Sequence, residues 1–326
     1  MPGLRQPSGT AFAIRDALPW SDLVGVVRAA EDAGYSTLFV PEIVARDAFV
    51  MLGALAGETR DLMLGTGIVP MRSRTPLLTA MAGVTVQERS GGRLLLGLGT
   101  GDVGRGALDE LREVVLAVRV LLSGGSADRK GRSVRLDLVP GAPVPIWISA
   151  LGPRAIRLAG EIADGVLLNW CPPERVAFAR EAIAEGANAA GRDPSEIVIG
   201  VYVRCWAGDE ADEAEAFLAM QRASGEYASF PAYARQLDQV GLGVEGAVAA
   251  EAHRAGRPDL VPEELVHAVC AFGADAAERL ETYRAAGADL PVLYPVVVAG
   301  DPAASLEATL LHLAPDRSSP QAPHPV

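Results

Sequence analysis

The residues most suggestive of chemistry lie between Arg93 and Gly104, in the stretch RLLLGLGTGDVG. Gly99, Gly101 and Gly104 fit the pattern G-x-G-x-x-G, and the carboxylate of Asp102 lies within it. In a dinucleotide-binding fold this pattern belongs to the first strand–helix–strand unit, and an acidic residue follows about 20 positions later at a strand end. Here the pattern follows the fourth predicted strand, and the loop SGGSADRKG lies at that distance. The dinucleotide interpretation is therefore rejected.

In an α/β barrel, the same glycines would lie at the carboxyl end of a strand, which is where the active sites of such barrels are built. Gly97, Gly99 and Gly101 would let a flat ring lie close against the backbone. The carboxylate of Asp102 would then point toward whatever occupies the barrel mouth. In the alternative interpretation, the glycines only turn a strand into a helix and Asp102 caps that helix.

Small residues follow two other predicted strands as well. Residues 65–67, Gly-Thr-Gly, end the third strand, and Gly152 precedes Pro153 at a helix start. Because glycine has no capping side chain, the first helical amides stay free to bind an anion, with Arg154 beside them. The alternative is an ordinary turn with proline at the first helical position. Three strand ends of this kind favour a planar, phosphorylated cofactor.

Short β-rich runs alternate with amphipathic helical runs along the chain. The predicted strands cover residues 10–14, 36–40, 61–69, 93–98, 144–149, 165–169, 196–206 and 290–297. The first helix is expected to begin with Ser21 as its N-cap and to end at Gly34. Further helices are predicted at 75–91, 107–122, 153–163, 173–191, 277–287 and 302–314.

Eight strand-then-helix units predict an α/β fold, a (β/α)8 TIM barrel, because parallel strands buried on both faces read as continuous apolar runs. A doubly wound sheet is the alternative. We expect one barrel domain over residues 1–316, with a mostly helical insertion at about 207–268 near the barrel mouth, before the last strand–helix unit. Residues 317–326 are expected to be a disordered tail.

Composition excludes several classes of protein. The formal net charge of −12 disfavours nucleic acid as a partner. The three cysteines lie far apart, which predicts neither a disulfide framework nor a metal site, and favours a reducing cytoplasm. We expect no signal peptide, because the first ten residues contain no apolar segment, and no membrane span, because no run of about 18 apolar residues occurs.

The stretches GTGIVPMRSRTPLLTAMAGVTVQERSGGRLLLGLGTGD and PVPIWISALGPRAIRLAGEIADGVLLNWCPPERV resemble the luciferase-like monooxygenase superfamily. The chain is most similar to the branch that uses the deazaflavin coenzyme F420 instead of FMN. The resemblance covers roughly residues 10–205, and the last strand, AGADLPVLYPVV, to a lesser degree. It implies a (β/α)8 barrel with the cofactor across its carboxyl end, and a cis peptide at Gly67–Ile68 behind the cofactor ring.

The resemblance also assigns roles to individual residues. Glu42 matches the acidic position that approaches the ring, Gly101 and Asp102 match a Gly-acid pair at the ring face, and Asp102 is the candidate catalytic proton donor. Residues 149–154 match the phosphate-binding turn, and 169–170 the region of the cofactor tail. The implied cofactor-binding residues are Glu42, Gly65, Thr66, Gly67, Ile68, Gly101, Asp102, Ser149, Ala150, Leu151, Gly152, Pro153, Arg154, Asn169 and Trp170.

The sequence departs from its relatives in two respects. Relatives often have a histidine after the acidic residue of the second strand, where this chain has Ile43, and none of its four histidines falls at a strand end in the matched region. This disfavours a sugar-phosphate dehydrogenase and a peroxyflavin-managing monooxygenase. Asp102 also stands where relatives often carry the longer glutamate.

The leading hypothesis is an F420-dependent oxidoreductase that transfers hydride to a small organic acceptor, with C=C or C=N reduction favoured. Arg72, Arg74, Arg105, Arg154 and Arg157 lie near predicted strand ends and are candidates to receive the anionic coenzyme tail, although solvated surface positions are the alternative, favoured for Arg157. A two-component FMN-dependent monooxygenase is the alternative function, and an accessory barrel that binds a flavin or lipid without turnover is a third. The expected partner is a small-molecule substrate. The apolar helix stripes could also form a homodimer, as barrels of the family it resembles often do, and the subunit number is left open.

Overall fold

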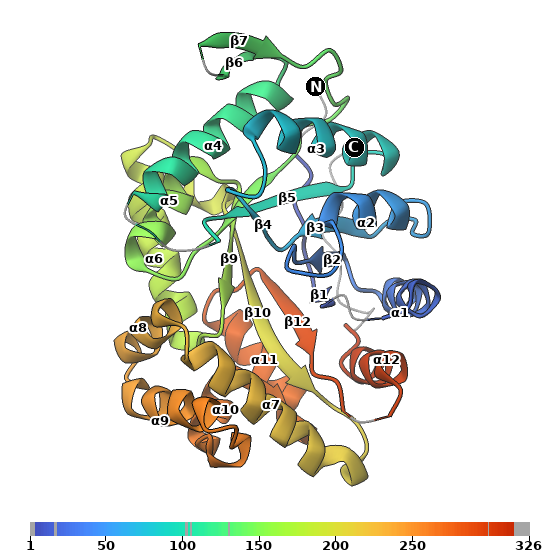
Figure 1. Cartoon of the computed structure of the whole chain (residues 1–326), viewed down its shortest axis with the longest axis vertical. Coiled ribbons are helices and arrows are strands. Elements are labelled where there is room, and N and C mark those ends of the chain that lie inside the picture. The colour runs from blue at the N-terminus through green and yellow to red at the C-terminus, as the bar shows by residue number, and fades with distance from the viewer. Residues whose placement is uncertain are drawn as a thin grey trace.

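A closed barrel of eight parallel strands forms the centre of the protein (Figure 1). The computed structural model describes residues 4–15, 18–101, 104, 106–129, 131–298 and 300–315. Going round the barrel, each strand pairs in parallel with the next, and the pairing of the seventh strand with both of its neighbours closes the ring. The barrel strands are β1 (Ala11–Ala13), β2 (Thr37–Val40), β3 (Met63–Thr66), β5 (Leu94–Gly99), β8 (Ile146–Ser149), β9 (Gly165–Asn169), β10 (Val198–Trp206) and β12 (Leu290–Pro295).

These strands coincide with the eight predicted ones, so the barrel prediction is confirmed and the doubly wound sheet is excluded. Their residues are buried almost throughout, as expected for strands with the barrel interior on one face and helices on the other. Short strands add to the sheet or stand beside it. They are β4 (Val69–Pro70) on β5, β11 (Cys270–Phe272) on β10, and the antiparallel pair β6 (Ser126–Arg129) and β7 (Arg132–Arg135).

Helices surround the barrel and pack on the outer faces of its strands (Figure 1). They are α1 (Trp20–Ala33), α2 (Ala48–Leu55), α3 (Pro76–Arg89), α4 (Ala107–Leu122), α5 (Pro153–Ile162), α6 (Pro173–Ala189), α11 (Ala276–Ala285) and α12 (Pro302–His312). In the described part of the chain, none of the helices has the length and apolar character needed to cross a membrane.

The expected helical insertion is present and contains no strand between residues 207 and 268, all of which are described. Its helices are α7 (Glu213–Ala228), α8 (Pro231–Gln239), α9 (Gly243–Arg254) and α10 (Glu263–Val269). They share a separate apolar core that includes Trp206 of β10 and Val296 after β12. The insertion therefore packs against the carboxyl ends of the barrel strands (Figure 1). Short 3-10 turns complete the chain at Pro194–Glu196, Glu210–Asp212, Pro258–Leu260 and Gly273–Asp275.

Two local predictions at helix ends had different outcomes. Gly34 ends α1 in the left-handed conformation, with φ of 101°, as expected for a C-terminal glycine. The prediction that Ser21 caps α1 is wrong: the N-cap is Pro19, two residues earlier, and the Ser21 hydroxyl donates to Asp22 instead. Pro19 holds its own backbone extended, so the chain turns helical directly after it.

Helices α5 and α6 are in unusually close contact. A methyl group added to Gly160 of α5 would lie 2.2 Å from the carbonyl oxygen of Ile183 in α6. In return, a methyl group added to Gly186 of α6 would lie 2.1 Å from the carbonyl oxygen of Arg157 in α5. Glycine at both positions lets the two backbones touch, and this contact fixes α5, whose N-terminus lies at the carboxyl end of β8.

Candidate functional site

The carboxyl ends of the barrel strands meet on one face, as they must in a parallel barrel. The residues singled out from the sequence follow β2, β3, β5, β8 and β9, so they come together around this barrel mouth. Asp102 and Arg105 lie outside the described residues, so the position of the candidate proton donor stays a prediction.

A bulge after β3 carries the cis peptide bond that the resemblance implied, between Gly67 and Ile68. The amide of Gly67 donates to Val40 of β2 at 2.8 Å, and the hydroxyl of Tyr202 donates to the carbonyl oxygen of Gly67 at 3.1 Å. Burial raises the pKa of Tyr202 well above its usual range, so this hydroxyl remains a donor. The bulge is thus held from the neighbouring strand and from across the barrel.

The glycines of β5 make room for this bulge. A methyl group added to Gly97 would lie 2.0 Å from the carbonyl oxygen of Thr66, and one added to Gly99 would lie 2.7 Å from the side chain of Ile68. Thr66 also exchanges hydrogen bonds of 2.8 Å with the amide and carbonyl of Gly97. The expectation that a flat ring lies directly against Gly97 and Gly99 is therefore corrected, because the protein's own chain fills that space.

The turn after β8 is open, as an anion site requires. Gly152 caps α5 without a side-chain hydrogen bond, Pro153 follows, and a methyl group added to Gly152 would meet nothing within 4 Å. The first hydrogen bond of the helix runs from Ile156 to Gly152, so the amides of Arg154 and Ala155 precede it and point out of the helix end. Ser149 and Leu151 are half-buried, and Ala150 is buried.

Most of the arginines expected to receive an anionic tail are already paired with carboxylates. Arg72 pairs with Glu110 at 2.8 Å, Arg74 with Glu42 at 3.0 Å, and Arg157 with Glu185. Arg157 lies on the surface, in line with the alternative favoured for it. Among the described members of this group, only Arg154 is exposed and makes no ion pair. Of the four described arginines in this group, Arg154 alone is left as a free cation, and it lies beside the helix start.

Glu42, after β2, lies in a network that joins three loops. Its carboxylate accepts hydrogen bonds from Arg74, from the hydroxyl of Ser73 at 3.1 Å and from the amide of Ala48 at 3.3 Å. Its side chain is only 13% exposed. Asp47 also binds Arg74, and although burial opposes it, hydrogen bonds from the Val50 amide and from Arg74 lower the pKa of Asp47. The network ties the bulge loop to the start of α2.

Asn169 and Trp170, at the end of β9, lie under the insertion. The side chain of Asn169 donates to the hydroxyl of Tyr233 at 2.9 Å. Gln236 donates to the carbonyl oxygens of Asn169 and Trp170 at 3.0 and 2.7 Å. Trp170 is 4% exposed and has a positive φ of 49°. Helix α8 therefore fixes the region that the resemblance assigned to the cofactor tail.

Arg204 was missed by the sequence interpretation. It lies on β10, is 9% exposed, and its guanidinium carbon is 3.4 Å from the ring centre of Tyr294 and 5.6 Å from that of Trp170. Burial disfavours the charged form, but Tyr294 and Tyr227 outweigh it and raise the pKa of Arg204. An arginine inside the otherwise apolar strand VIGVYVRCW was the available signal, since a charged residue is rarely buried without a partner.

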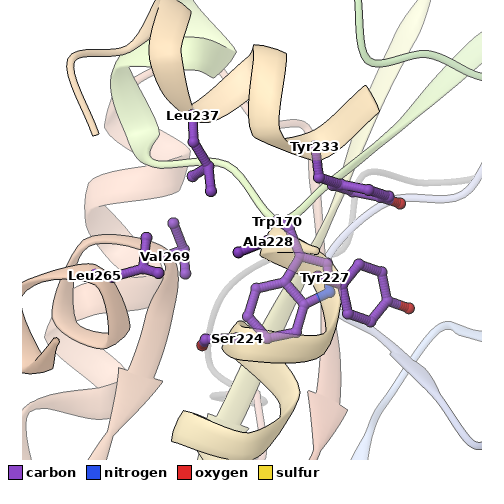
Figure 2. Close-up of a pocket in the computed structure, with 8 residues that line it drawn as sticks. All are labelled: Trp170, Ser224, Tyr227, Ala228, Tyr233, Leu237, Leu265 and Val269. Atoms are coloured by element: carbon purple, nitrogen blue, oxygen red, sulfur yellow. The ribbon is translucent and has the colours of Figure 1, made fainter. Parts of the chain in front are cut away.

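A small pocket lies between Trp170 and the insertion (Figure 2). Its volume of about 10 Å³ has room for a single water molecule. One side is aliphatic, and on the other the rings of Trp170 and Tyr227 lie 4.6 Å apart. The pocket is lined by Trp170, Ser224, Tyr227, Ala228, Tyr233, Leu237, Leu265 and Val269.

The three described histidines lie on helices, and two further tryptophans, Trp147 and Trp206, pack in apolar clusters. Trp147 is fully buried inside the barrel and donates to Gln6, and Trp206 stacks on Phe272. His253, His267 and His312 lie on helices α9, α10 and α12, and His324 falls outside the described residues. Within the described ranges, no group of His, Cys, Asp and Glu side chains could hold a metal ion.

A family model, curated relatives and solved structures all show similarity between this chain and one group of proteins. A family model described as luciferase-like monooxygenase matches residues 5–290. The chain is 33% identical over 208 residues to a 5,10-methylenetetrahydromethanopterin reductase of Methanolobus tindarius, which covers 60% of this chain and 63% of that protein. It is 30% identical over 210 residues to an F420-dependent glucose-6-phosphate dehydrogenase of Nakamurella multipartita, covering 54% and 61%.

The aligned part thus spans less than two thirds of the length of these curated relatives. Among solved structures, the coenzyme F420 dependent tetrahydromethanopterin reductase from Methanopyrus kandleri superposes with a TM-score of 0.77. It has 22% sequence identity and covers 94% of this chain and 98% of its own, a likeness of fold.

Proposed function

The chain belongs to the luciferase-like monooxygenase family, and from that premise we propose that it is an F420-dependent oxidoreductase. It transfers hydride between the reduced deazaflavin and a small organic acceptor, with reduction of a C=C or C=N bond favoured. The observation that carries the proposal is the similarity, at 30–33% identity, to relatives named as a 5,10-methylenetetrahydromethanopterin reductase and an F420-dependent glucose-6-phosphate dehydrogenase.

The residues at the barrel mouth fit such a coenzyme. The bulge of residues 65–68 and the backbone at Gly101, with a φ of 65°, would support the ring. The open turn of residues 149–154 would hold the phosphate, because it combines free helical amides, empty space at Gly152 and the exposed Arg154. Asn169 and Trp170 would border the tail.

When bound, the deazaflavin supplies the hydride-carrying carbon. The chain's own contribution is orientation and exclusion of water. Tyr202 and Val40 hold the bulge in one position, and the Glu42–Arg74 pair holds the neighbouring loop. The insertion helices pack over Asn169 and Trp170 and would keep water from the acceptor.

Asp102 is proposed to donate the proton that completes the reduction. We expect Asp102→Asn to leave the affinity for F420 within about twofold and to lower kcat by roughly 100-fold, the usual contribution of a positioned general acid. Asp109→Asn, an exposed carboxylate in the first turn of α4, is the matched control and should change neither quantity. Unchanged turnover in Asp102→Asn would remove Asp102 as the acid.

The experiment that tests the function is a pair of fluorescence titrations, with F420 and with FMN, each at low and high salt. Selective binding of F420 that weakens with salt is the expected result, and Arg154→Gln should reduce the salt dependence. Selective binding of FMN, with oxygen consumption when reduced FMN is supplied, would replace the proposal by the two-component monooxygenase. Binding of F420 without turnover of any acceptor would favour an accessory protein.

A further inference from the structure

Arg204 is a buried cation with aromatic neighbours and no anion. Among the described residues, no Asp or Glu forms an ion pair with it, although almost every other buried or half-buried arginine at the strand ends has a carboxylate or carbonyl partner. A buried charge without a partner is costly, and proteins retain it where something else supplies the opposite charge.

The aromatic rings do not satisfy this guanidinium completely. The contact of 3.4 Å with Tyr294 lies over the ring and uses the flat face of the cation. The N–H groups of arginine point outward in the plane of the guanidinium and need acceptors at its edge. The side chains of Tyr227 and Tyr294 hydrogen-bond to the guanidinium of Arg204, but its Nε is buried and has no hydrogen-bond acceptor in the described structure.

A second unsatisfied donor lies beside it. The indole nitrogen of Trp170 is also buried without an acceptor, and the ring of Trp170 lies 5.6 Å from the guanidinium carbon of Arg204. Two buried donors that both lack an acceptor, one of them charged, match an anion with several acceptor oxygens. A carboxylate is planar and accepts paired hydrogen bonds from arginine, so it suits the edge of the guanidinium.

The aromatic rings around Arg204 would pack against an unsaturated or aromatic acid, which has to enlarge the pocket beside Trp170, because in this structure that pocket has room for one water molecule. The rings of Trp170, Tyr227 and Tyr294 surround Arg204, and Figure 2 shows the hydroxyls of Tyr227 and Tyr233 on the same side of the pocket. The hydroxyl of Tyr233 is held by Asn169, at the end of β9. The cluster therefore joins the barrel mouth, where the coenzyme is proposed to bind, to the insertion.

We propose that Arg204 and the indole N–H of Trp170 bind the carboxylate of the hydride acceptor, so that the substrate is an unsaturated or aromatic carboxylic acid. This inference rests on the proposed function. Arg204 is here a substrate-binding residue that determines specificity. The shape of the cluster, flat rings around one cation, favours this acid over an aliphatic alcohol or a sugar.

The test uses trans-cinnamate and its neutral methyl ester as probes, on the full chain saturated with F420. Binding is followed by calorimetry and by quenching of tryptophan fluorescence, since Trp170 lies in the cluster. We expect cinnamate to bind at least 30-fold more tightly than the ester. Arg204→Met should abolish this preference, and Arg204→Lys should retain part of it. Arg254→Met, an exposed arginine on α9, is the matched control and should retain all of it.

Folding is checked by thermal denaturation without probe. Because methionine replaces an unpaired charge by an apolar chain of similar length, Arg204→Met should not lower Tm, whereas a structural role would lower it. Cinnamate should raise Tm of the wild type and not of Arg204→Met. Equal affinity for acid and ester in the wild type would overturn the inference.

Titration of the wild type and of Arg204→Met with F420 distinguishes failure of the proposed function from failure of this inference. If the wild type does not bind F420, the proposed function fails, whatever the probes do. Arg204→Met could instead weaken the binding of F420 and leave the preference for cinnamate over its ester unchanged. The anion that binds Arg204 would then belong to the coenzyme, and the inference about the acceptor would be overturned.

Discussion

Replacing Gly160 or Gly186 by alanine is expected to destabilise the protein by about 3 kcal/mol in each case, the upper range for overpacking. At both positions the added methyl group would lie within 2.3 Å of a backbone carbonyl oxygen in the facing helix. Backbone cannot rotate away as a side chain can, so α5 and α6 must move apart along their contact. A loss of this size is a large fraction of the 5–15 kcal/mol that stabilises an ordinary domain.

Urea unfolding followed by circular dichroism measures this loss. Gly25→Ala is the matched control, because Gly25 lies in α1 with nothing within 4 Å of an added methyl group. It should stabilise the protein by up to about 1 kcal/mol, since alanine is the better helix former. The double variant Gly160→Ala/Gly186→Ala should lose less unfolding free energy than the two single variants lose together, because one methyl group already separates the helices. Stability within about 0.5 kcal/mol of the wild type, the usual size of the effect of a surface substitution, would show that the two helix backbones are not in contact.

The second large effect is expected at the bulge behind the proposed ring site. A methyl group added to Gly67 would lie 1.8 Å from the hydroxyl oxygen of Tyr202 and 3.0 Å from Cβ of Phe39. Both side chains are buried, so the bulge has to shift toward the barrel mouth. We expect Gly67→Ala to weaken F420 binding roughly 30-fold, which corresponds to about 2 kcal/mol of displaced contacts.

A double-mutant cycle with Tyr202→Phe isolates the cause. Tyr202→Phe alone removes one hydrogen bond to Gly67 and should weaken F420 binding by less than about tenfold. In Gly67→Ala/Tyr202→Phe the clashing oxygen is gone, so part of the lost affinity should return. Titration with F420 and urea unfolding are measured on all four proteins. If Gly67→Ala binds F420 as the wild type does, the bulge is not part of the coenzyme site.

The strands of the barrel could be predicted because their signal is local. A run such as Leu94–Leu98 is apolar at every position, which parallel strands between a filled barrel and a helix layer require. Helix α2 was not predicted, because its eight residues, AFVMLGAL, are apolar all round and show no 3.6-residue period. Its N-cap, Asp47, is recognisable only once the helix is known.

The barrel mouth could be identified from the sequence as the candidate site for the same reason. The glycines after β3, β5 and β8 identify the carboxyl ends of strands, and the resemblance of the surrounding stretches implied the cis peptide at Gly67–Ile68, which the structure contains. The role of Asp102 stays a prediction, since it falls outside the described residues.

What the sequence alone determined is the residue types and their local order: eight buried strands, glycine at or near the carboxyl ends of three of them, and an arginine within β10. Only the tertiary structure decided which of these groups meet. Glu42 binds Arg74, 32 positions away, and Asn169 binds Tyr233, 64 positions away. Barrel closure brings strand ends together that are far apart in the chain, so whether an arginine is paired, like Arg74, or left without an anion, like Arg204, depends on neighbours that no local pattern contains.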